Sequence, residues 1–322
     1  MKILLTGATG FIGSHVAREL VGRRHEVYAL VRSPARGKFL KEMKAHLVIG
    51  SLEELDRPGV VLPEVDGVIH NAGVIRAIKN DEFYRVNFEG TRNLVNALKG
   101  QRLKNFVFVS SISARGPNRR RQDPQGTGPV SHYGKSKLEA ENFLLSSREK
   151  FPVTIVRPPI VYGPGDPETL RLFKMFRRGF LAHFPKGIQR VSFIFVNDLA
   201  RLLVAAVETG DAGFGPYHPD DGKGGYSWDE VVEIAAGVFN RQVRKLNLSL
   251  WVAKACALAS EAGGRIFGYA PFLTREKYKE LLCPDWTCGD PQIVEKFRLD
   301  SFTNLQSGFL KAREWYEKEG WL

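Results

Sequence analysis

The chain has 322 residues, and its 47 Lys and Arg against 35 Asp and Glu give a net charge of +12. Its content of 43% hydrophobic and 25% charged residues is ordinary for a soluble globular protein. The longest apolar stretch, residues 248–259, is interrupted by Lys254 and is too short to span a bilayer, which excludes a membrane-spanning helix there.

Cysteine usage and the first residues indicate a cytoplasmic protein. The first strand is expected to start at Lys2, so no signal peptide is expected. Cys256, Cys283 and Cys288 are an odd number of cysteines without a CxxC pair, which predicts free thiols in a reducing cytosol. No His or Cys cluster has the spacing of metal ligands, so no metal is expected.

The first 33 residues show the pattern of a β-α-β unit. A short apolar run precedes a glycine-rich turn and an amphipathic stretch in which Ile12, Val16 and Leu20 recur at helical spacing. A second apolar run, "HEVYALV", completes the unit.

Further apolar runs predict a parallel sheet. They alternate with helical patterns at 81–99 and 134–149, as in sheets covered by helices on both faces. Connections of this kind are right-handed, which gives a doubly wound Rossmann sheet. The runs lie at residues 45–50, 66–73, 104–111 and 151–158.

The regular alternation fades beyond residue 166. A basic amphipathic helix is predicted at 168–179, a strand at 191–196 and a helix from Asn197, followed by turns, helices and many aromatic residues. We therefore predict an α/β protein with a Rossmann domain and a smaller C-terminal α+β substrate-binding domain. The Rossmann domain takes residues 1–165 and 190–210, and the substrate-binding domain takes 166–189 and 211–322.

The glycines of "TGATGFIG" predict a dinucleotide site. Gly7 allows a tight turn, Gly10 lets the backbone approach a pyrophosphate, and Gly13 permits close packing of helix on strand. The helix that follows would offer its N-terminal N–H groups to the phosphates.

The end of the second strand favours NADP over NAD. An acidic residue there would hold a ribose 2′-hydroxyl, whereas an arginine accommodates a 2′-phosphate. Arg32 occupies the position, Arg36 and Lys38 add positive charge, and no carboxylate occurs before Glu42. NAD stays open as the alternative.

Tyr133 and Lys137 in "SHYGKSK" are four residues apart at the start of a predicted helix, and so share one face. A free phenol titrates near pH ~10, and an adjacent cation favours the phenolate. The pair is suited to acid/base catalysis, although the same spacing also occurs on solvated helix faces.

Seven motifs in order resemble the extended short-chain dehydrogenase/reductase family, of the NAD-dependent epimerase/dehydratase type. The resemblance runs through most of the chain and is strongest over residues 1–165. The motifs are "TGATGFIG", "HNAG", "VNFEGTRNL", "FVFVSSISARG", "YGKSK", "RPPIVYGPGD" and "FIFVNDLA".

The resemblance implies roles for individual residues. Ser111 matches the catalytic serine, Tyr133 the acid/base, and Lys137 its partner, which also contacts the nicotinamide ribose. Hydride transfer needs a proton moved to or from the substrate oxygen, which Tyr133 and Ser111 would supply and orient. The implied cofactor-binding residues are Gly7, Thr9, Gly10, Phe11, Ile12, Gly13, Arg32, Ser51, Leu52, Asn71, Ala72, Gly73, Asn87, Ser110, Tyr133, Lys137, Pro158 and Ile160.

Four positions depart from the nucleotide-sugar enzymes of this family. Ile160 and Val191 stand where those enzymes usually have Asn and Arg, which removes two contacts to a diphosphate. Ile75 replaces a basic residue, and Ser51 replaces an Asp that often contacts adenine. These departures favour the dihydroflavonol-reductase and 3β-hydroxysteroid-dehydrogenase-like branch, which acts on apolar ketones and alcohols. The many C-terminal aromatic residues suit such a pocket or simply a well-packed subdomain.

Three surface features leave alternatives open. The basic segment 114–122 is a solvated loop or an electropositive rim that attracts an anionic substrate or membrane, while no nucleic-acid motif accompanies it. The helix at 248–264 is a lid or core helix, favoured here over one that dips into a membrane surface. The helices at 81–99 and 134–149 resemble those of the family's dimer interface, which predicts a homodimer.

Three functions follow in order of preference. The first is an NAD(P)-dependent oxidoreductase that acts on a carbonyl or secondary alcohol, and the second is a nucleotide-sugar epimerase or dehydratase that recycles its cofactor internally. The third is a non-catalytic, cofactor-sensing scaffold, which the complete set of Ser111, Tyr133 and Lys137 disfavours.

Overall fold

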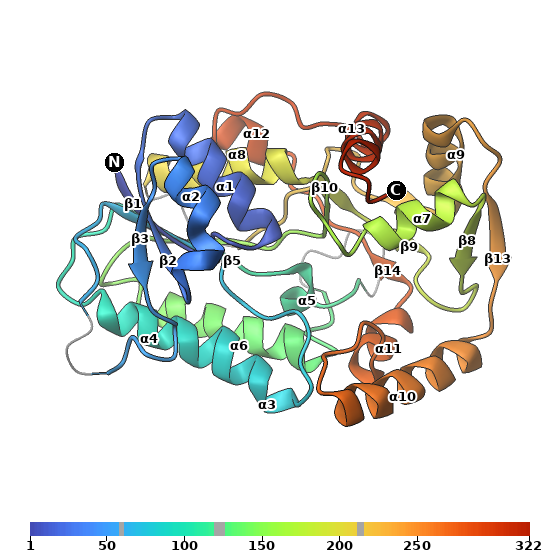
Figure 1. Ribbon diagram of the computed structural model, residues 1–322, viewed down its shortest axis with the longest axis horizontal. Helices are drawn as coiled ribbons and strands as arrows, with labels where there is room; N and C mark the ends of the chain where they lie inside the picture. The colour runs from blue at the N-terminus through green and yellow to red at the C-terminus, as the bar shows by residue number, and fades with distance from the viewer. Residues whose placement is uncertain (58–60, 119–125, 211–215) are drawn as a thin grey trace.

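A seven-stranded, all-parallel sheet forms the centre of the molecule (Figure 1). The computed structural model describes residues 1–57, 61–118, 126–210 and 216–322. The strand order β11-β6-β5-β4-β1-β2-β3 reverses direction beside β1, as in a doubly wound Rossmann sheet, so the predicted fold class is confirmed. The strands are β1 (Lys2–Thr6), β2 (Glu26–Val31), β3 (His46–Ile49), β4 (Gly67–His70), β5 (Asn105–Val109), β6 (Val153–Val156) and β11 (Pro216–Tyr217).

Helices cover both faces of this sheet. The helices α1 (Phe11–Gly22) and α8 (Val196–Thr209) pack on one face, where Val16 and Leu20 are fully buried. The short helices α2 (Lys38–Glu42) and α12 (Ile293–Lys296) lie on the same side in Figure 1. The other face is covered by α4 (Gly90–Ala97) and α6 (His132–Ser146).

The predicted helix at 81–99 has three parts. It begins as α3 (Asn80–Phe83), continues as a π-helical segment from Tyr84 to Glu89, and ends as α4. Such widened turns often occur at functional sites, and this one contains Asn87, a predicted cofactor residue. The sequence pattern gives the length of this helix but not its interruption.

The C-terminal half builds a second lobe with its own hydrophobic core. Its strands form three small sheets, one pairing β10 with β7, one in the order β12-β9-β14, and one pairing β13 with β8. The predicted strand at 191–196 is split between β9 and β10. The elements are β7 (Ile160–Tyr162), α7 (Leu170–Arg177), β8 (Phe180–His183), β9 (Arg190–Val191), β10 (Phe193–Phe195), β12 (Tyr226–Ser227), α9 (Trp228–Phe239), β13 (Arg244–Asn247), α10 (Leu250–Phe267), α11 (Arg275–Leu281), β14 (Asp285–Trp286) and α13 (Leu305–Lys318).

Aromatic side chains fill the core of this lobe. Phe309 on α13 is fully buried, and its ring centroid lies 5.1 Å from that of Phe173 and 5.2 Å from that of Tyr162. Such edge-on pairs add to the stabilisation from apolar burial. These buried aromatic residues therefore serve packing. The boundary between the two predicted domains stays a prediction.

We expect Phe309→Ala to lower the free energy of unfolding by about 3–5 kcal/mol, because it leaves a cavity among these rings. Urea unfolding followed by circular dichroism measures the change. The neighbouring Leu310, which is exposed, is the matched control, and Leu310→Ala should change stability little. Equal losses in the two variants would contradict this packing account.

Across the described residues, no helix is both long and apolar enough to cross a membrane.

Candidate active site

The three predicted catalytic residues lie at the carboxyl end of β5 and on the first turns of α6. Ser111 is the N-cap of α5 (Ile112–Arg115), and its hydroxyl accepts a hydrogen bond from the Ser113 N–H at 3.1 Å. Ser131 caps α6 in the same way by accepting from Gly134 N–H, so that Tyr133 lies in the first turn and Lys137 one turn later. Ser111 and Tyr133 are therefore both positioned at the N-terminus of a helix whose first turn is capped by a serine side chain.

The side chain of Ser111 lies close enough to the Tyr133 phenol to lower the pKa of that phenol as a hydrogen-bonding neighbour. Burial raises the pKa of Tyr133 to about 12, the contact with Ser111 acts in the opposite direction, and the nearby carboxylate of Glu280 raises it further. The lowering expected from the sequence is therefore not seen in the protein alone. Burial is the largest cause, because removing the phenolate from water disfavours the charged form.

Lys137 connects this pair to the nucleotide-binding edge of the sheet. Its side chain is buried, and its ammonium donates a hydrogen bond to the Val109 carbonyl at 2.9 Å. A Cβ atom at Gly73 would lie 3.1 Å from this ammonium, so the turn after β4 passes directly beside it. Burial lowers the pKa of Lys137 to about 8, and Glu141 opposes the change.

The glycine turn has the shape of a phosphate cradle. Gly7 has φ +71, which favours glycine, and a Cβ atom at Gly13 would lie 2.0 Å from the Gly7 carbonyl oxygen. Gly10 is the exposed N-cap of α1 and has no side chain to occupy the N–H groups of the first turn. These groups are free to bind an anion, so the residues present fit a dinucleotide.

A chain of buried hydrogen bonds supports the turn after β4. The Ala72 N–H donates to the Thr6 hydroxyl at 3.1 Å, and that hydroxyl lies 2.6 Å from Nδ1 of His70. Nε2 of His70 lies 2.9 Å from the Thr91 hydroxyl, which donates to the carbonyl of Asn87 at 2.7 Å. Burial lowers the pKa of His70 to about 3, so its ring is neutral and acts as donor and acceptor at once.

Asn87 links the turn after β4 to α6 through hydrogen bonds. Its side-chain oxygen accepts from Val74 N–H at 2.8 Å, and its amide donates to the Val74 carbonyl and to the Ser136 hydroxyl. Ser136 in turn donates to the carbonyl of Tyr133 at 2.8 Å. The supporting roles of His70, Thr91 and Ser136 were missed from the sequence, where only the His70 of "VIHNAG" gave a signal.

The remaining predicted cofactor residues surround the same edge with different exposures. Ser110 turns its hydroxyl to the buried carboxylate of Glu141, and Pro158 accepts a hydrogen bond from Ile112 N–H at 3.0 Å. Ser51 donates its hydroxyl to Glu54 at 2.8 Å. Leu52 is buried, Ile160 lines the cavity described next, Thr9 and Arg32 are exposed, and Phe11, Ile12 and Asn71 are partly exposed.

A cavity of about 1160 Å³ opens beside Ser111 and Tyr133. It runs between the two lobes, from the ends of β5 and α6 to α10 and α11. Ile160 and Val191, two of the four departures noted above, form part of its apolar wall, and Ile75 lies exposed at its edge. Its lining also includes basic side chains, among them Arg171 and Arg265. The arginines at 119–121 lie outside the described residues.

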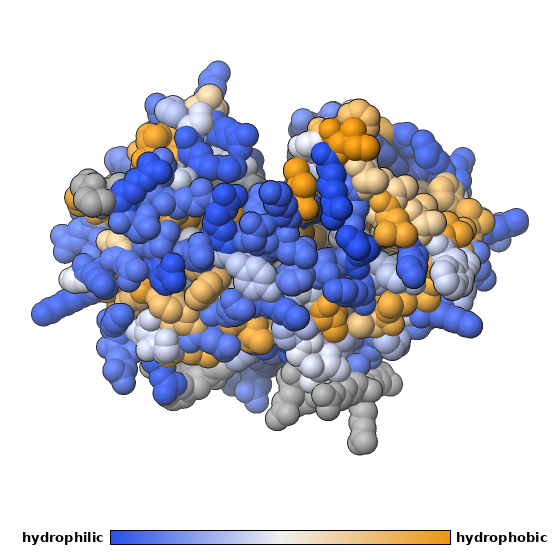
Figure 2. Space-filling model, turned by 90° about the horizontal axis from the view of Figure 1, so that it is seen from below, coloured by the Kyte–Doolittle hydropathy of each residue, from blue (hydrophilic) through white to orange (hydrophobic). Residues whose placement is uncertain are grey.

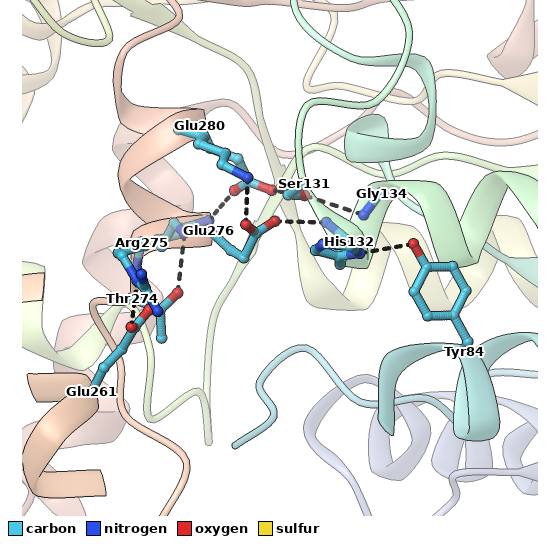
Figure 3. A network of polar contacts seen from close by, with 11 residues as sticks. Tyr84, Ser131, His132, Gly134, Glu261, Thr274, Arg275, Glu276 and Glu280 are labelled. Atoms are coloured by element: carbon cyan, nitrogen blue, oxygen red, sulfur yellow. Dashed lines mark hydrogen bonds and ion pairs between the residues drawn. The ribbon is translucent and has the colours of Figure 1, made fainter. Parts of the chain in front are cut away.

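The helix α11 holds the N-terminus of the catalytic helix (Figure 3). Glu276 accepts a hydrogen bond from His132 N–H at 2.9 Å, and Glu280 accepts one from the Ser131 hydroxyl at 2.7 Å. Carboxylates are favoured at this position because a helix N-terminus is electropositive. On the other side, Arg275 forms an ion pair with Glu261 of α10. The C-terminal lobe therefore contacts the helix that carries Tyr133.

We expect Glu280→Gln to lower the apparent pKa of Tyr133, because it removes the negative charge that disfavours the phenolate. The alkaline limb of the rate profile should move to lower pH, since a tyrosine that ionises more readily stops donating its proton sooner. Steady-state rates against pH measure the shift. Glu261→Gln is the control, because Glu261 pairs with Arg275 instead, and an unchanged alkaline limb in Glu280→Gln would contradict the coupling.

Comparisons with known proteins agree with this geometry. The model of the NAD dependent epimerase/dehydratase family matches residues 3–218. A ceramide reductase of Caulobacter vibrioides is 32% identical and aligns with 99% of this chain and 96% of its own. A UDP-glucose 4-epimerase of Vibrio cholerae is 28% identical over 85% of this chain and 84% of its own. The solved structure of MoeE5 with UDP-glucose and NAD shares the fold, with a TM-score of 0.75, 23% identity and 99% of each chain covered.

Proposed function

Since the chain belongs to the NAD-dependent epimerase/dehydratase family, within the extended short-chain dehydrogenases/reductases, we propose that it reduces a carbonyl group, or oxidises the matching alcohol, in a large apolar substrate. The enzyme is a dehydrogenase/reductase or an epimerase/dehydratase by family. The observation that carries the proposal is that Ser111 and Tyr133 line one cavity together with the apolar residues Ile160 and Val191.

A nicotinamide cofactor supplies or takes up the hydride, and the protein's residues handle the proton and the orientation. Tyr133 donates its phenolic proton to the substrate oxygen in the reductive direction and takes it back in the oxidative one. Ser111 hydrogen-bonds to the same oxygen and fixes its position. Lys137, held between the Val109 carbonyl and Gly73, places a positive charge beside the cofactor turn and on the helix of Tyr133. The cofactor residues predicted from the sequence are proposed unchanged.

The apolar wall and the relative named as a ceramide reductase support a substrate with a long hydrocarbon part. A cavity of this volume accommodates such a molecule. The test is a panel of hydrophobic ketones of increasing chain length, with loss of NADPH absorbance as the readout. Stoichiometric turnover that improves with chain length supports the proposal, and inactivity towards the whole panel would sink it.

The alternative is interconversion of nucleotide sugars. The basic side chains of Arg171 and Arg265 at the cavity favour an anionic ligand, and one relative is named as a UDP-glucose 4-epimerase. This reaction predicts cofactor retained through purification and a rise in melting temperature with UDP. A melting temperature that no nucleoside diphosphate changes would count against it.

We propose NADP as the preferred cofactor. Arg32, directly after β2, is exposed, as are Arg36 and Lys38, and the carboxylate that would repel a 2′-phosphate is missing from this segment. Arg32→Ala should weaken NADPH binding by about tenfold, the effect of one hydrogen bond to a charged group, and leave NADH binding unchanged. Calorimetric titration measures both, and equal loss for the two cofactors would argue against the assignment.

The assembly and location are proposed on separate grounds. The helices α4 and α6 lie side by side below the sheet (Figure 1), which supports a homodimer built from these helices of two copies. Light scattering after gel filtration tests the homodimer.

The three free cysteines support a cytoplasmic location. We retain the division into a Rossmann domain and a C-terminal substrate-binding domain, supported by the separate core of the second lobe.

A further inference from the structure

The helix α10 does not bury its large apolar side chains against the rest of the protein. Its buried residues are the small ones, Ala253, Ala257 and Gly264, whereas its large apolar residues are exposed. Trp251 is 75% exposed, Ile266 75% and Phe267 77%. The large apolar side chains of α10 therefore face solvent, and its small residues face the protein.

Three of these exposed residues share one face of the helix, and Phe267 lies at its C-terminal end. Trp251, Leu258 and Ile266 are seven and eight residues apart, so they fall on the side of the helix opposite Ala253 and Ala257. Seven of the sixteen exposed large apolar side chains in the described residues lie between positions 251 and 272. Seen from below, hydrophobic residues gather on the lobe that contains α10, next to a hollow (Figure 2).

The charges around this face have one sign. Lys254 and Arg265 lie at one edge of the stripe, and the sole carboxylate in the helix, Glu261, is mostly covered and paired with Arg275. The ammonium of Lys254 lies 5.2 Å from the ring centroid of Trp251, so the cation and the aromatic residue are presented together. The whole chain carries a net charge of +12. A surface of this kind complements one that is apolar inside and anionic outside.

We propose that α10 is a membrane-docking helix that lies in the interface of a bilayer containing anionic phospholipid. Trp251, Leu258 and Ile266 enter the boundary between headgroups and acyl chains from one face of the helix, Phe267 enters it from the C-terminal end, and Lys254 and Arg265 contact the phosphates. This replaces the sequence-based preference for a lid or core helix with a helix whose large side chains face outward.

The substrate cavity adds a reason for this location. Its lining includes Gly264 and Arg265 of α10 and Phe272 of the following turn, so the cavity reaches the docking helix itself. A substrate with a hydrocarbon chain would enter from the bilayer along this helix. That consequence rests on the proposed function, whereas the docking does not.

Vesicle co-sedimentation tests the docking without any turnover. The full-length protein is mixed with vesicles of phosphatidylcholine alone, or of phosphatidylcholine and phosphatidylglycerol at about three to one, at low salt. We expect binding to the anionic vesicles and a blue shift of tryptophan emission that Trp251→Phe removes. The double variant Ile266→Glu with Phe267→Glu should lose at least about tenfold in partition coefficient. Lys254→Glu with Arg265→Glu should abolish the preference for anionic lipid.

Leu310→Glu is the matched control, because Leu310 is an exposed apolar residue on another helix, α13. It should bind vesicles like the wild type, and all variants should keep the wild-type melting temperature. Failure of the wild type to bind anionic vesicles would overturn the proposal. So would equal binding by the double glutamate variant, or a dimer in solution that this variant dissociates, since α10 would then be a contact between copies.

Discussion

Tyr133→Phe should reduce turnover by about 10²–10⁴-fold while cofactor affinity and melting temperature stay at wild-type values. The change removes one oxygen atom, that of the phenol which lines the cavity together with Ser111. Without it the substrate oxygen has no proton donor at that place. The measurements are steady-state rates and a calorimetric titration with cofactor.

Tyr84→Phe provides the matched control for this prediction. Its hydroxyl lies 2.9 Å from Nδ1 of His132, one residue before Tyr133, so the variant removes a neighbouring phenol outside the Ser111 pair. We expect its turnover to stay close to that of the wild type. If Tyr133→Phe retained wild-type turnover, Tyr133 would have no part in proton transfer. If neither variant had any effect because no turnover exists, the non-catalytic alternative would gain.

Gly10→Ala and Gly13→Ala should fail in different ways, although the two glycines belong to one turn. A Cβ atom at Gly10 would meet only the Gly7 carbonyl oxygen, at 3.3 Å, so the fold should tolerate it. The same atom stands on the exposed N-terminus of α1, where a pyrophosphate would approach, so cofactor binding should weaken by at least about tenfold. At Gly13 the Cβ atom would lie 2.0 Å from that oxygen, and we expect a loss of stability of about 3 kcal/mol.

Gly22→Ala near the end of α1 controls for the change in helix propensity, because a Cβ atom there meets nothing within 4 Å. It should leave cofactor affinity unchanged and stabilise the helix slightly. Melting temperatures and cofactor titrations for the three variants complete the comparison. Full cofactor affinity in Gly10→Ala would show that the phosphates are bound elsewhere.

Features encoded by short-range patterns could be predicted from the sequence. The buried strands β1, β4 and β5 appear as apolar runs because both faces of each strand are covered. The turn at Gly7–Gly13 could also be predicted, because the strand, the turn and the helix follow one another directly in the sequence. Tyr133 and Lys137 share a helix, so their spacing alone places them on one side of it.

Features that depend on contacts between distant segments could not be predicted. The hydrogen bonds that Glu276 and Glu280 accept at the N-terminus of α6 join residues more than 140 positions apart. The raised pKa of Tyr133 comes from burial that the sequence does not reveal. The orientation of α10 was also hidden, because a helical pattern gives an apolar face but not whether the protein covers it.

The destination of the hydride tests the central claim most directly. The enzyme would be incubated with NADPH that carries deuterium at the transferred position of C4, together with the most active long-chain ketone, and the product analysed by mass spectrometry. We predict one deuterium at the new carbinol carbon for each cofactor oxidised, and the same labelled product formed about 10²–10⁴-fold more slowly with Tyr133→Phe. Unlabelled product, together with interconversion of a nucleotide sugar without net oxidation of the cofactor, would contradict the account.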